Sequence, residues 1–284
     1  MMRRKSGWGW KLFLGTALVL VLVWTLFPVY WMLSTSLKSS TAVFDNPPQL
    51  FPLLPTIASY QKIATGTVGV TPISRFFTNS VISSLATVAT ATVFATLASF
   101  ALSRLRFKFR KGIMLGVLVT QMFPLVVLLT PLYILYLRMG LINTYLGLVI
   151  AFTSFTLPFC IWMLKSFIDT IPIELDEAAI VDGSSRFGVL MRIILPLITP
   201  GIVATAVFAF LDAWNNLLFP MTLTTDVSMK TLPPGMILAF GGEFKHDWSG
   251  MMATSVLVAL PVVLVFVFLQ KYLIEGLTAG SVKE

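Results

Sequence analysis

Long apolar stretches, separated by short charged segments, dominate the pattern along the chain. A helix rises about 1.5 Å per residue, so roughly 20 apolar residues cross the hydrocarbon core of a bilayer, which is about 30 Å thick. Six runs without a charged residue approach or exceed that length, at 12–37, 76–103, 112–137, 139–164, 193–211 and 248–270. The fifth is expected to continue past Asp212 to about Phe219. We therefore predict an all-α polytopic membrane protein with helices at about 12–33, 76–103, 112–137, 143–165, 196–219 and 250–271.

The segments between the predicted helices complete the organisation. Six helices place both termini on one side of the membrane, and we expect that side to be the cytoplasm. The core then spans 76–273, and the other segments are a cytoplasmic N-terminus at 1–11, an external loop at 34–75, a cytoplasmic loop at 169–196, an external loop at 221–249 and a cytoplasmic tail at 274–284. The first apolar run is too long and too bulky for a cleaved signal, so we expect a retained helix.

Composition and charge agree with a membrane protein. The chain is 57% hydrophobic and 11% charged, whereas soluble domains carry about 25% charged residues, which excludes a soluble fold. The net charge of +8 fits the topology, because fourteen of the 20 Lys and Arg fall in the segments assigned to the cytoplasm. The run RLRFKFRK at 104–111 is the strongest cytoplasmic anchor. The basic excess therefore indicates membrane orientation and lipid head-group contact, and no nucleic-acid partner is expected.

Small and helix-breaking residues characterise several of the spans. Residues 83–99 contain twelve Ala, Ser or Thr, a composition that allows close helix packing in lipid, so we expect the second helix to be buried in protein. Four prolines lie inside spans, at positions 124, 131, 158 and 261. They indicate either broken helices along a transport path or simple kinks in a packed bundle.

Asp212 is the only acid inside a predicted span, and an intramembrane carboxylate suggests a cavity or a charged partner. Its position toward the outer leaflet weakens the case for a buried proton relay. Trp214, Asn215 and Asn216 follow it, and an aromatic face beside amide groups suits a neutral polyhydroxy solute. The alternative is an interfacial tryptophan with interhelical amide bonds. Further candidates for lining a path are Asn79, Ser83 and Gln121.

Five of the twelve acids lie between Asp169 and Asp182, in a loop assigned to the cytoplasm. Residues 173–181 are predicted to form a short helix that begins after Pro172 and carries acids in its first turns, which suits the helix dipole. Gly183 provides a permissive turn, and Ser184 or Ser185 can cap a second helix. The expected result is a rigid helix pair with an exposed Glu177, suited to docking. A helix lying on the bilayer is disfavoured because its acids would face anionic lipid.

The spacing within this loop resembles a known family. The pattern is Glu177-Ala178-Ala179, three residues, Gly183, nine residues, Ile193, one residue, and Leu195-Pro196. It is similar to the EAA loop of membrane subunits of bacterial and archaeal ABC importers. The resemblance implies the transmembrane fold of type I ABC importers, with this loop as a coupling helix inserted in a cleft of a cytoplasmic ATPase subunit.

The resemblance also implies residue roles. Glu177 would make a charged contact with the ATPase, Ala178 and Ala179 would pack closely, and Gly183 would give the bend. Coupling is predicted to run through Glu177, Asp182 and Gly183.

Other segments resemble the carbohydrate branch of this family, particularly the partner subunits of maltose and oligosaccharide permeases. These segments are WNNLLFP at 214–220, KTLPPG at 230–235 and the ending QKYLIEGLTAGSVKE. The resemblance implies ATPase contacts by the tail residues Gly276, Leu277, Thr278, Ala279 and Gly280. It also implies contact between the external loop and a solute-binding protein, although a solvated connection is the alternative; the candidates are Glu243, Phe244, His246, Asp247 and Trp248.

The implied assembly contains this chain, a second homologous permease, two ATPase subunits and an extracytoplasmic sugar-binding protein, in a bacterial or archaeal cytoplasmic membrane. No GxxxxGK[ST] phosphate loop occurs in the sequence, so ATP and magnesium are expected on the ATPase and no cofactor on this chain. One His and one Cys provide neither a metal site nor a nucleophile pair, so we expect no catalytic residue and no enzyme activity.

Two alternatives remain at this stage. One is a secondary transporter driven by an ion gradient, which would need coupling charges near the midplane and usually internal repeats. Asp212 is its sole candidate residue. The other is an ABC permease for a peptide, an amino acid or a polyamine, and a cationic cargo would favour several acids facing the cavity.

Overall fold

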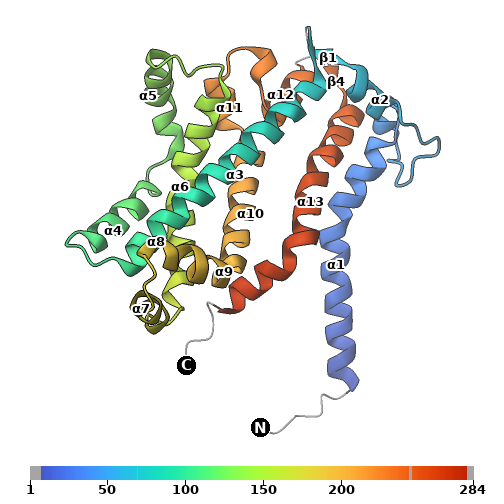
Figure 1. Ribbon diagram of the computed structural model, residues 1–284. Coiled ribbons are helices and arrows are strands. Elements are labelled where there is room, and N and C mark those ends of the chain that lie inside the picture. The colour runs from blue at the N-terminus through green and yellow to red at the C-terminus, as the bar shows by residue number, and fades with distance from the viewer. Residues whose placement is uncertain (1–7, 69, 243–244, 280–284) are drawn as a thin grey trace. The chain divides into compact units, whose positions relative to one another are not determined.

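The computed structural model of the protein describes residues 8–68, 70–242 and 245–279, and helices form most of them (Figure 1). The chain divides into two compact units. Unit 1 comprises residues 1–67 and 236–259, and unit 2 comprises residues 68–235 and 260–284. The divisions fall inside two helices, α12 (Leu232–Phe240) and α13 (Trp248–Ala279).

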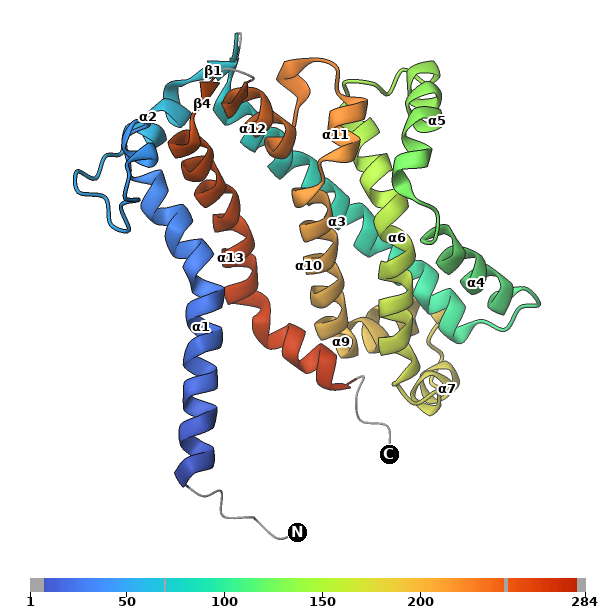
Figure 2. The ribbon, with the colours of Figure 1, turned by 180° about the vertical axis from the view of Figure 1, so that it is seen from behind.

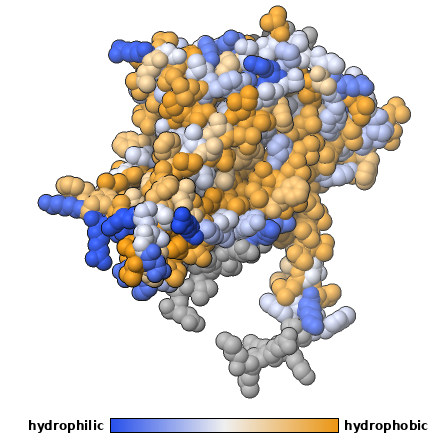
Figure 3. Space-filling view, in the orientation of Figure 1, coloured by the Kyte–Doolittle hydropathy of each residue, from blue (hydrophilic) through white to orange (hydrophobic). Residues whose placement is uncertain are grey.

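Unit 1 is built around α1 and the first part of α13. Its elements are α1 (Trp8–Ser36), η1 (Ala42–Phe44), α2 (Ala58–Thr65), the end of α12, β3 (Gly241–Gly242), β4 (Lys245–His246) and the start of α13. Strands β3 and β4 pair antiparallel, with Gly241 opposite His246. None of the apolar window of α1 is buried within the chain, and its surface is largely hydrophobic in Figure 3. This helix is therefore suited to contact with lipid.

Hydroxyl groups join the elements of unit 1. The Ser59 and Ser249 hydroxyls lie 2.5 Å apart, and Ser249 donates to the Lys38 carbonyl at 2.7 Å. The Lys38 ammonium in turn donates to the Gln49 carbonyl at 2.6 Å. Burial lowers the pKa of Lys38 more than the nearby Asp45 raises it. These bonds fix the end of α1 and the segment after it against α2 and α13.

Unit 2 contains three long helices that pack against one another, as the two opposite views show (Figures 1 and 2). They are α3 (Ile73–Arg104), α6 (Tyr145–Asp169) and α10 (Thr199–Asn215). The division at residue 67 falls inside β1 (Thr67–Val68). The remaining elements of unit 2 are β2 (Thr71–Pro72), α4 (Arg110–Thr120), α5 (Leu125–Arg138), α7 (Glu174–Val181), α8 (Arg186–Val189), the π-helical turn η2 (Leu190–Ile194), α9 (Leu195–Leu197), α11 (Leu218–Leu223) and η3 (Val227–Met229).

Small residues form the face of α3 that packs inward, and the predicted burial is confirmed for this face, while 39% of the apolar window of the helix is buried. Its buried positions include Ser83, Ser84, Thr87, Ala91, Ala95 and Ser99. Between the helices, the Thr90 and Thr153 hydroxyls lie 2.8 Å apart, and Thr156 donates to Asp212 at 2.6 Å. Close approach of the backbones and hydrogen bonds across helices are the interactions that hold membrane helices together.

Four helices of the described chain are long and apolar enough to cross a membrane, and two bent pairs bring the number to six if each pair is one span. The four are α1, α3, α6 and α13. The bent pairs are α4 with α5, at 97°, and Arg186–Leu197 with α10, at 79°. The four single helices coincide with predicted helices, with ends that differ by several residues.

The helix predicted at 112–137 is interrupted, because the chain breaks between α4 and α5 at Pro124, one of the prolines expected to mark a break or a kink. Pro124 precedes α5 with an extended backbone, and proline disfavours a helical conformation in the residue before it. The predicted helix at 196–219 is also too long. Helix α10 begins at Thr199 with Pro200 in its first turn and ends at Asn215, and Asn216 is extended before α11.

The predicted external loops contain short helices. The range 34–75 includes η1 and α2, and the range 221–249 includes α12. Helix α12 begins at Leu232, and Pro233 and Pro234 lie in its first turn, where a missing N–H costs no intrahelical hydrogen bond. The sequence LPPG therefore starts a helix here.

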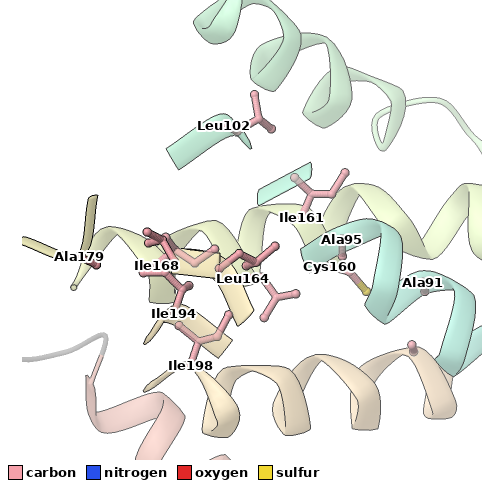
Figure 4. Packing of buried hydrophobic residues seen from close by; sticks show 13 residues of the cluster. Ala91, Ala95, Leu102, Cys160, Ile161, Leu164, Ile168, Ala179, Ile194 and Ile198 are labelled. Carbon is pink, nitrogen blue, oxygen red and sulfur yellow. The ribbon is translucent and has the colours of Figure 1, made fainter. Parts of the chain in front are cut away.

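One hydrophobic cluster of unit 2 joins the long helices to the segment around α7 (Figure 4). Leu102 comes from α3, Ile168 from α6, Ala179 from α7 and Ile194 from η2. Ile168 and Ile194 are fully buried. The cluster fixes α7 to the ends of the long helices through apolar packing.

Candidate functional site

The candidate site is built on α7, the helix predicted at 173–181. Ile173 precedes the helix, and Glu174, Asp176 and Glu177 lie in its first turn. Carboxylates near a helix N-terminus interact favourably with the unpaired N–H groups and the helix dipole. The sequence thus stabilises a short helix that would be marginal in isolation.

A glycine turn ends α7, as predicted. Gly183 has φ of +87°, a conformation that residues with a side chain rarely adopt. The Ser184 N–H donates to the Ala179 carbonyl at 2.9 Å and the Gly183 N–H to the Ile180 carbonyl at 3.0 Å, which together form a Schellman motif. Ser185, rather than Ser184, caps α8 by accepting from the Gly188 N–H at 3.1 Å. The two helices are therefore joined in a defined geometry.

Substitution of Gly183 should test this turn. No atom lies within 4 Å of a Cβ placed there, so the cost of a side chain is conformational only. We expect Gly183→Val to reduce stability by about 1–2 kcal/mol, and Gly183→Asn to reduce it less, because Asn tolerates the left-handed region. Thermal unfolding of the detergent-purified protein measures both, with Gly112→Ala as the control. Equal losses for Val and Asn would contradict the explanation.

Helix α7 has a buried and an exposed side. Asp176 and Ala179 are buried, whereas Glu177 and Ala178 are exposed, and Val181 is 86% exposed. Residues three apart share a helix face, which explains the pairing of positions 176 and 179. Ala179 therefore packs inside its own chain, whereas Ala178 lies on the exposed side, and the predicted roles of both alanines in coupling stay predictions.

The rest of the predicted motif lies in the segment that follows α7. Ile193 lies in η2, and Leu195 and Pro196 begin α9. Ile193 and Leu195 pack against the same hydrophobic cluster as Ala179, while Pro196 is exposed. Asp182 is exposed at the end of α7. Of these positions, Ile193 and Leu195 therefore pack against the cluster that fixes α7.

The end of α3 makes polar contacts with α7 that the sequence did not reveal. Arg104 Nε lies 2.6 Å from Asp176 Oδ2, and each side chain is only 9% exposed. A second guanidinium nitrogen of Arg104 donates to the Ile171 carbonyl at 2.8 Å. The neighbouring Ser103 donates to Asp169 Oδ1 at 2.5 Å, and Lys165 also pairs with Asp169. From the sequence, this basic run was interpreted only as a signal of membrane orientation and as a contact for lipid head groups.

A groove of about 590 Å³ opens beside this ion pair. Its lining carries positive charge from Arg104, Arg106 and Arg186 and negative charge from Asp176 and Glu177. Apolar side chains complete it, among them Phe100, Phe107 and Ile180. The groove and the exposed side of α7 form one surface that combines charge with apolar area, as docking surfaces do.

Several residues predicted to line a path are instead buried and bonded. Asn79 is fully buried, donates to the Ser228 and Lys230 carbonyls at 2.8 Å each, and accepts from the Tyr145 hydroxyl at 2.6 Å. Ser83 is also fully buried and donates to the Asn79 carbonyl at 2.7 Å. In this structure Asn79 ties α3 to other segments of the chain, whereas the Ser83 hydroxyl bonds within α3 itself.

Trp214, another predicted path residue, is also buried in this structure. It is 1% exposed, stacks on Phe210 with ring centroids 5.4 Å apart, and meets the edge of Phe77 at 5.6 Å. Asn215 is exposed and donates to the Leu211 carbonyl at 2.9 Å. Asn216 accepts from the Phe219 N–H at 3.1 Å at the start of α11. The buried tryptophan presents no ring face to a solute in this arrangement.

Asp212 and Gln121 remain candidates for lining a path. Asp212 is partly exposed and accepts from Thr156. Gln121 is exposed at the break between α4 and α5, where it donates to the Phe155 carbonyl at 2.8 Å. It also lines an apolar hollow of about 420 Å³ that Pro158 borders. This bond joins the break between α4 and α5 to the backbone of α6.

Of the predicted binding-protein contacts, Asp247 has partners in its own unit. Lys62 Nζ lies 2.5 Å from Asp247 Oδ2, Oδ1 accepts from the Gly250 N–H at 2.9 Å, and Ser40 donates at 3.4 Å. Burial raises the pKa of Asp247. The hydrogen bonds from Lys62, Gly250 and Ser40 and the charge of Lys62 together lower this pKa by more than burial raises it, so the net shift is downward. The carboxylate caps α13.

The other predicted contacts are less fully described. Trp248 begins α13 and is 40% exposed, and His246 lies in β4. Glu243 and Phe244 lie outside the described residues. Of the tail, residues Gly276, Leu277, Thr278 and Ala279 belong to the end of α13, and Gly280 lies outside the described residues. These roles stay predictions.

The cap at Asp247 provides a test with a pH signature. Asp247→Ala should reduce stability by about 1–2 kcal/mol, whereas Asp247→Asn should lose less because Asn also caps helices. Since the folded pKa lies below the ordinary value, the carboxylate stabilises the fold above that value, about 3.9, and this stabilisation is lost as the pH falls through the folded pKa. Melting temperatures between pH 3 and pH 7 measure this. A gap between wild type and Asn that widened toward low pH would contradict it.

Comparison with known proteins identifies the family. Residues 91–278 match the family described as the binding-protein-dependent transport system inner membrane component. The chain belongs to this family. The membership confirms the importer family that the loop pattern indicated, and the matched region contains α7 and the glycine turn. The apolar helices and the family together show a multi-pass membrane protein.

Relatives cover nearly the whole chain. The sulfoquinovosyl glycerol transport system permease protein of Agrobacterium fabrum is 35% identical over 93% of this chain and 91% of its own. The diacetylchitobiose uptake system permease protein of Streptomyces coelicolor is 35% identical over 93% and 94%. The trehalose/maltose transport system permease protein of Thermococcus litoralis is 34% identical over 93% and 94%.

A solved structure shares the fold. It is a bacterial ABC transporter involved in the import of the acidic polysaccharide alginate, and its matching chain superposes with a TM-score of 0.82 at 19% identity. The match covers 96% of this chain and 99% of that chain. The helix arrangement is therefore that of an ABC importer permease.

Proposed function

We propose that the chain is a permease subunit of an ATP-driven importer for a sugar, and that it forms half of the path across the cytoplasmic membrane. The observation that carries this proposal is the match to permeases over more than nine tenths of the chain, because the named cargoes of those relatives are glycosides and oligosaccharides. The other half of the path would come from a second, homologous permease.

The exposed side of α7 is the surface that would meet the ATPase. With both termini in the cytoplasm, the basic residues follow the positive-inside rule and α7 lies on the cytoplasmic side. The exposed residues on this helix are Glu177, Ala178 and Val181, and the hydrophobic cluster packs against its opposite side. A rigid helix with an acidic, partly apolar exposed side fits a cleft that carries positive charge.

The cycle then follows from this arrangement. ATP binding, with magnesium, closes the partner ATPases and displaces α7, and the displacement opens the path outward to receive sugar from the extracytoplasmic binding protein. Hydrolysis resets the path inward. The cargo is neutral in this proposal, because α3, α6 and α10 contain only two acids, Asp169 at the end of α6 and Asp212 in the last turn of α10. Asp212 already accepts a hydrogen bond from Thr156.

Purification from native membranes tests the assembly. The tagged chain in gentle detergent should recover a P-loop ATPase and a second permease, identified by mass spectrometry. Glu177→Lys should lose the ATPase, while Glu174→Lys, which reverses an exposed acid of the same helix, should retain it. Recovery of the wild-type chain without an ATPase would refute the proposal and favour a gradient-driven carrier.

The cargo needs its own measurement. Uptake of a disaccharide or oligosaccharide by cells that express the full system should stop when ATP is depleted and continue when an ionophore dissipates the ion gradients. The co-purified binding protein should bind that sugar. A binding protein that instead binds an amino acid, a peptide or a polyamine would change the cargo and leave the ATP-driven importer intact.

A further inference from the structure

The joint between α3 and α7 differs from the rest of the interface around α7. Ala179 contributes apolar packing, whereas Arg104 and Asp176 contribute an ion pair with side chains that are each 9% exposed. Asp176 Oδ1 accepts no hydrogen bond from the described residues, and Arg104 Nε is not aligned for one. The charge of Arg104 is thus the main compensation for burying this carboxylate.

Arg104 also controls the path of the chain into α7. Its guanidinium group donates to the Ile171 carbonyl and pairs with Asp176, so it contacts the chain on both sides of Pro172. Ser103, the preceding residue, donates to Asp169 at the end of α6. Two consecutive residues at the end of α3 therefore hold the end of α6, the connecting segment and α7.

We propose that Arg104 and Asp176 are positioning residues, and that their ion pair transmits the displacement of α7 to α3 during the transport cycle. The inference rests on the proposed function, because it requires an ATPase that moves α7. A groove of about 590 Å³ beside the pair leaves room for α7 to slip past α3 if the attachment is weak. Opposite charges with a second bond to Ile171 resist that slip, while apolar side chains of similar size leave it possible.

The decisive variant replaces both charges with apolar residues, as Arg104→Met with Asp176→Leu. Replacing a buried ion pair as a whole is often neutral for stability, so this double variant should assemble with the ATPase and the second permease at wild-type yield. We expect the stimulation of ATP hydrolysis by the sugar-loaded binding protein, and sugar uptake, to fall about tenfold, which is within the range of coupling between sites. Lys108→Met, which removes an exposed charge of the same basic run outside the groove lining, should stay within about twofold of wild type.

A second variant keeps opposite charges but exchanges them, as Arg104→Asp with Asp176→Arg. It should recover part of the stimulation, at a level above the apolar variant. Normal stimulation and uptake in the apolar variant would overturn the inference, because packing alone would then suffice. Loss of assembly in both double variants would also overturn it, since the pair would serve folding only. Failure of the proposed function looks different, because the wild-type chain itself would then bring no ATPase.

Discussion

Asp176→Leu alone is expected to lower stability by about 3–5 kcal/mol, because it leaves the Arg104 charge buried without its carboxylate. The guanidinium group would retain only the bond to the Ile171 carbonyl. For a chain of this size, each kcal/mol corresponds to a shift of about 2–4 °C, so the midpoint should fall by on the order of 10 °C. Thermal unfolding of the purified protein, followed by tryptophan fluorescence, measures the shift.

The neighbouring acid provides the matched control. Glu177→Leu makes the same chemical change one residue further along α7, but at an exposed position, and should alter stability by less than about 0.5 kcal/mol. Adding Arg104→Met to Asp176→Leu should restore most of the midpoint, since no unpaired charge is then buried. If Asp176→Leu melted at the same temperature as Glu177→Leu, the pair would not be buried in solution.

The periodic and local features of the fold followed from the sequence. Charge-free runs of about 20 residues or more predicted α1, α3, α6 and α13, because a bilayer sets a minimum length for an apolar helix. The small residues of α3 predicted its burial. The loop around α7 was predicted closely, since a glycine turn and a serine cap act over three to six residues. These features depend on neighbours along the chain.

The helix breaks could not be located in the same way. Four prolines within spans were expected to mark either breaks or kinks, and of these Pro124 coincides with a break, while Pro131, Pro158 and Pro261 lie inside continuous helices. The outcome depends on distant groups that satisfy the backbone, such as the bond from Gln121 to the Phe155 carbonyl. Such partners are set by the packing of α4 and α5 on α6, which a pattern of hydropathy does not specify.

The contacts of the polar residues also depend on packing that the sequence does not specify. Groups that suit a sugar occur on Asn79, Ser83 and Trp214. The sequence does not reveal that Asn79 is already hydrogen-bonded to Lys230 and Tyr145, or that Trp214 already stacks on Phe210. The ion pair of Arg104 with Asp176 joins residues from separate segments of the chain. The sequence contains a basic run and an acidic loop. We interpreted the basic run as a signal of membrane orientation and the acidic loop as a docking site, without a link between them. Their pairing joins the two roles at one place in the fold.

Gly201→Val should lower stability by about 1–3 kcal/mol, because α10 passes close to α6 at this position. A Cβ at position 201 would lie 2.5 Å from Cγ and Cδ2 of Phe167, nearer than non-bonded carbon atoms approach. The Phe167 ring packs against the hydrophobic cluster that holds α7, so it cannot move aside without disturbing that cluster. Unfolding midpoints measure the effect, and Gly116→Val, at a helix position with nothing within 4 Å, is the control.

A second substitution separates this clash from a general loss of helix packing. Phe167→Ala removes the ring that the new side chain would meet, so Gly201→Val should cost less in that background than in the wild type. The difference should be about 0.5–3 kcal/mol, the range measured for residues in contact. Strictly additive losses would show that the two helices do not approach closely at Gly201. Because the ring contacts the same cluster as Ala179, the double variant also shows whether loosening α6 from α10 weakens the support of α7, which impaired recovery of the ATPase would reveal.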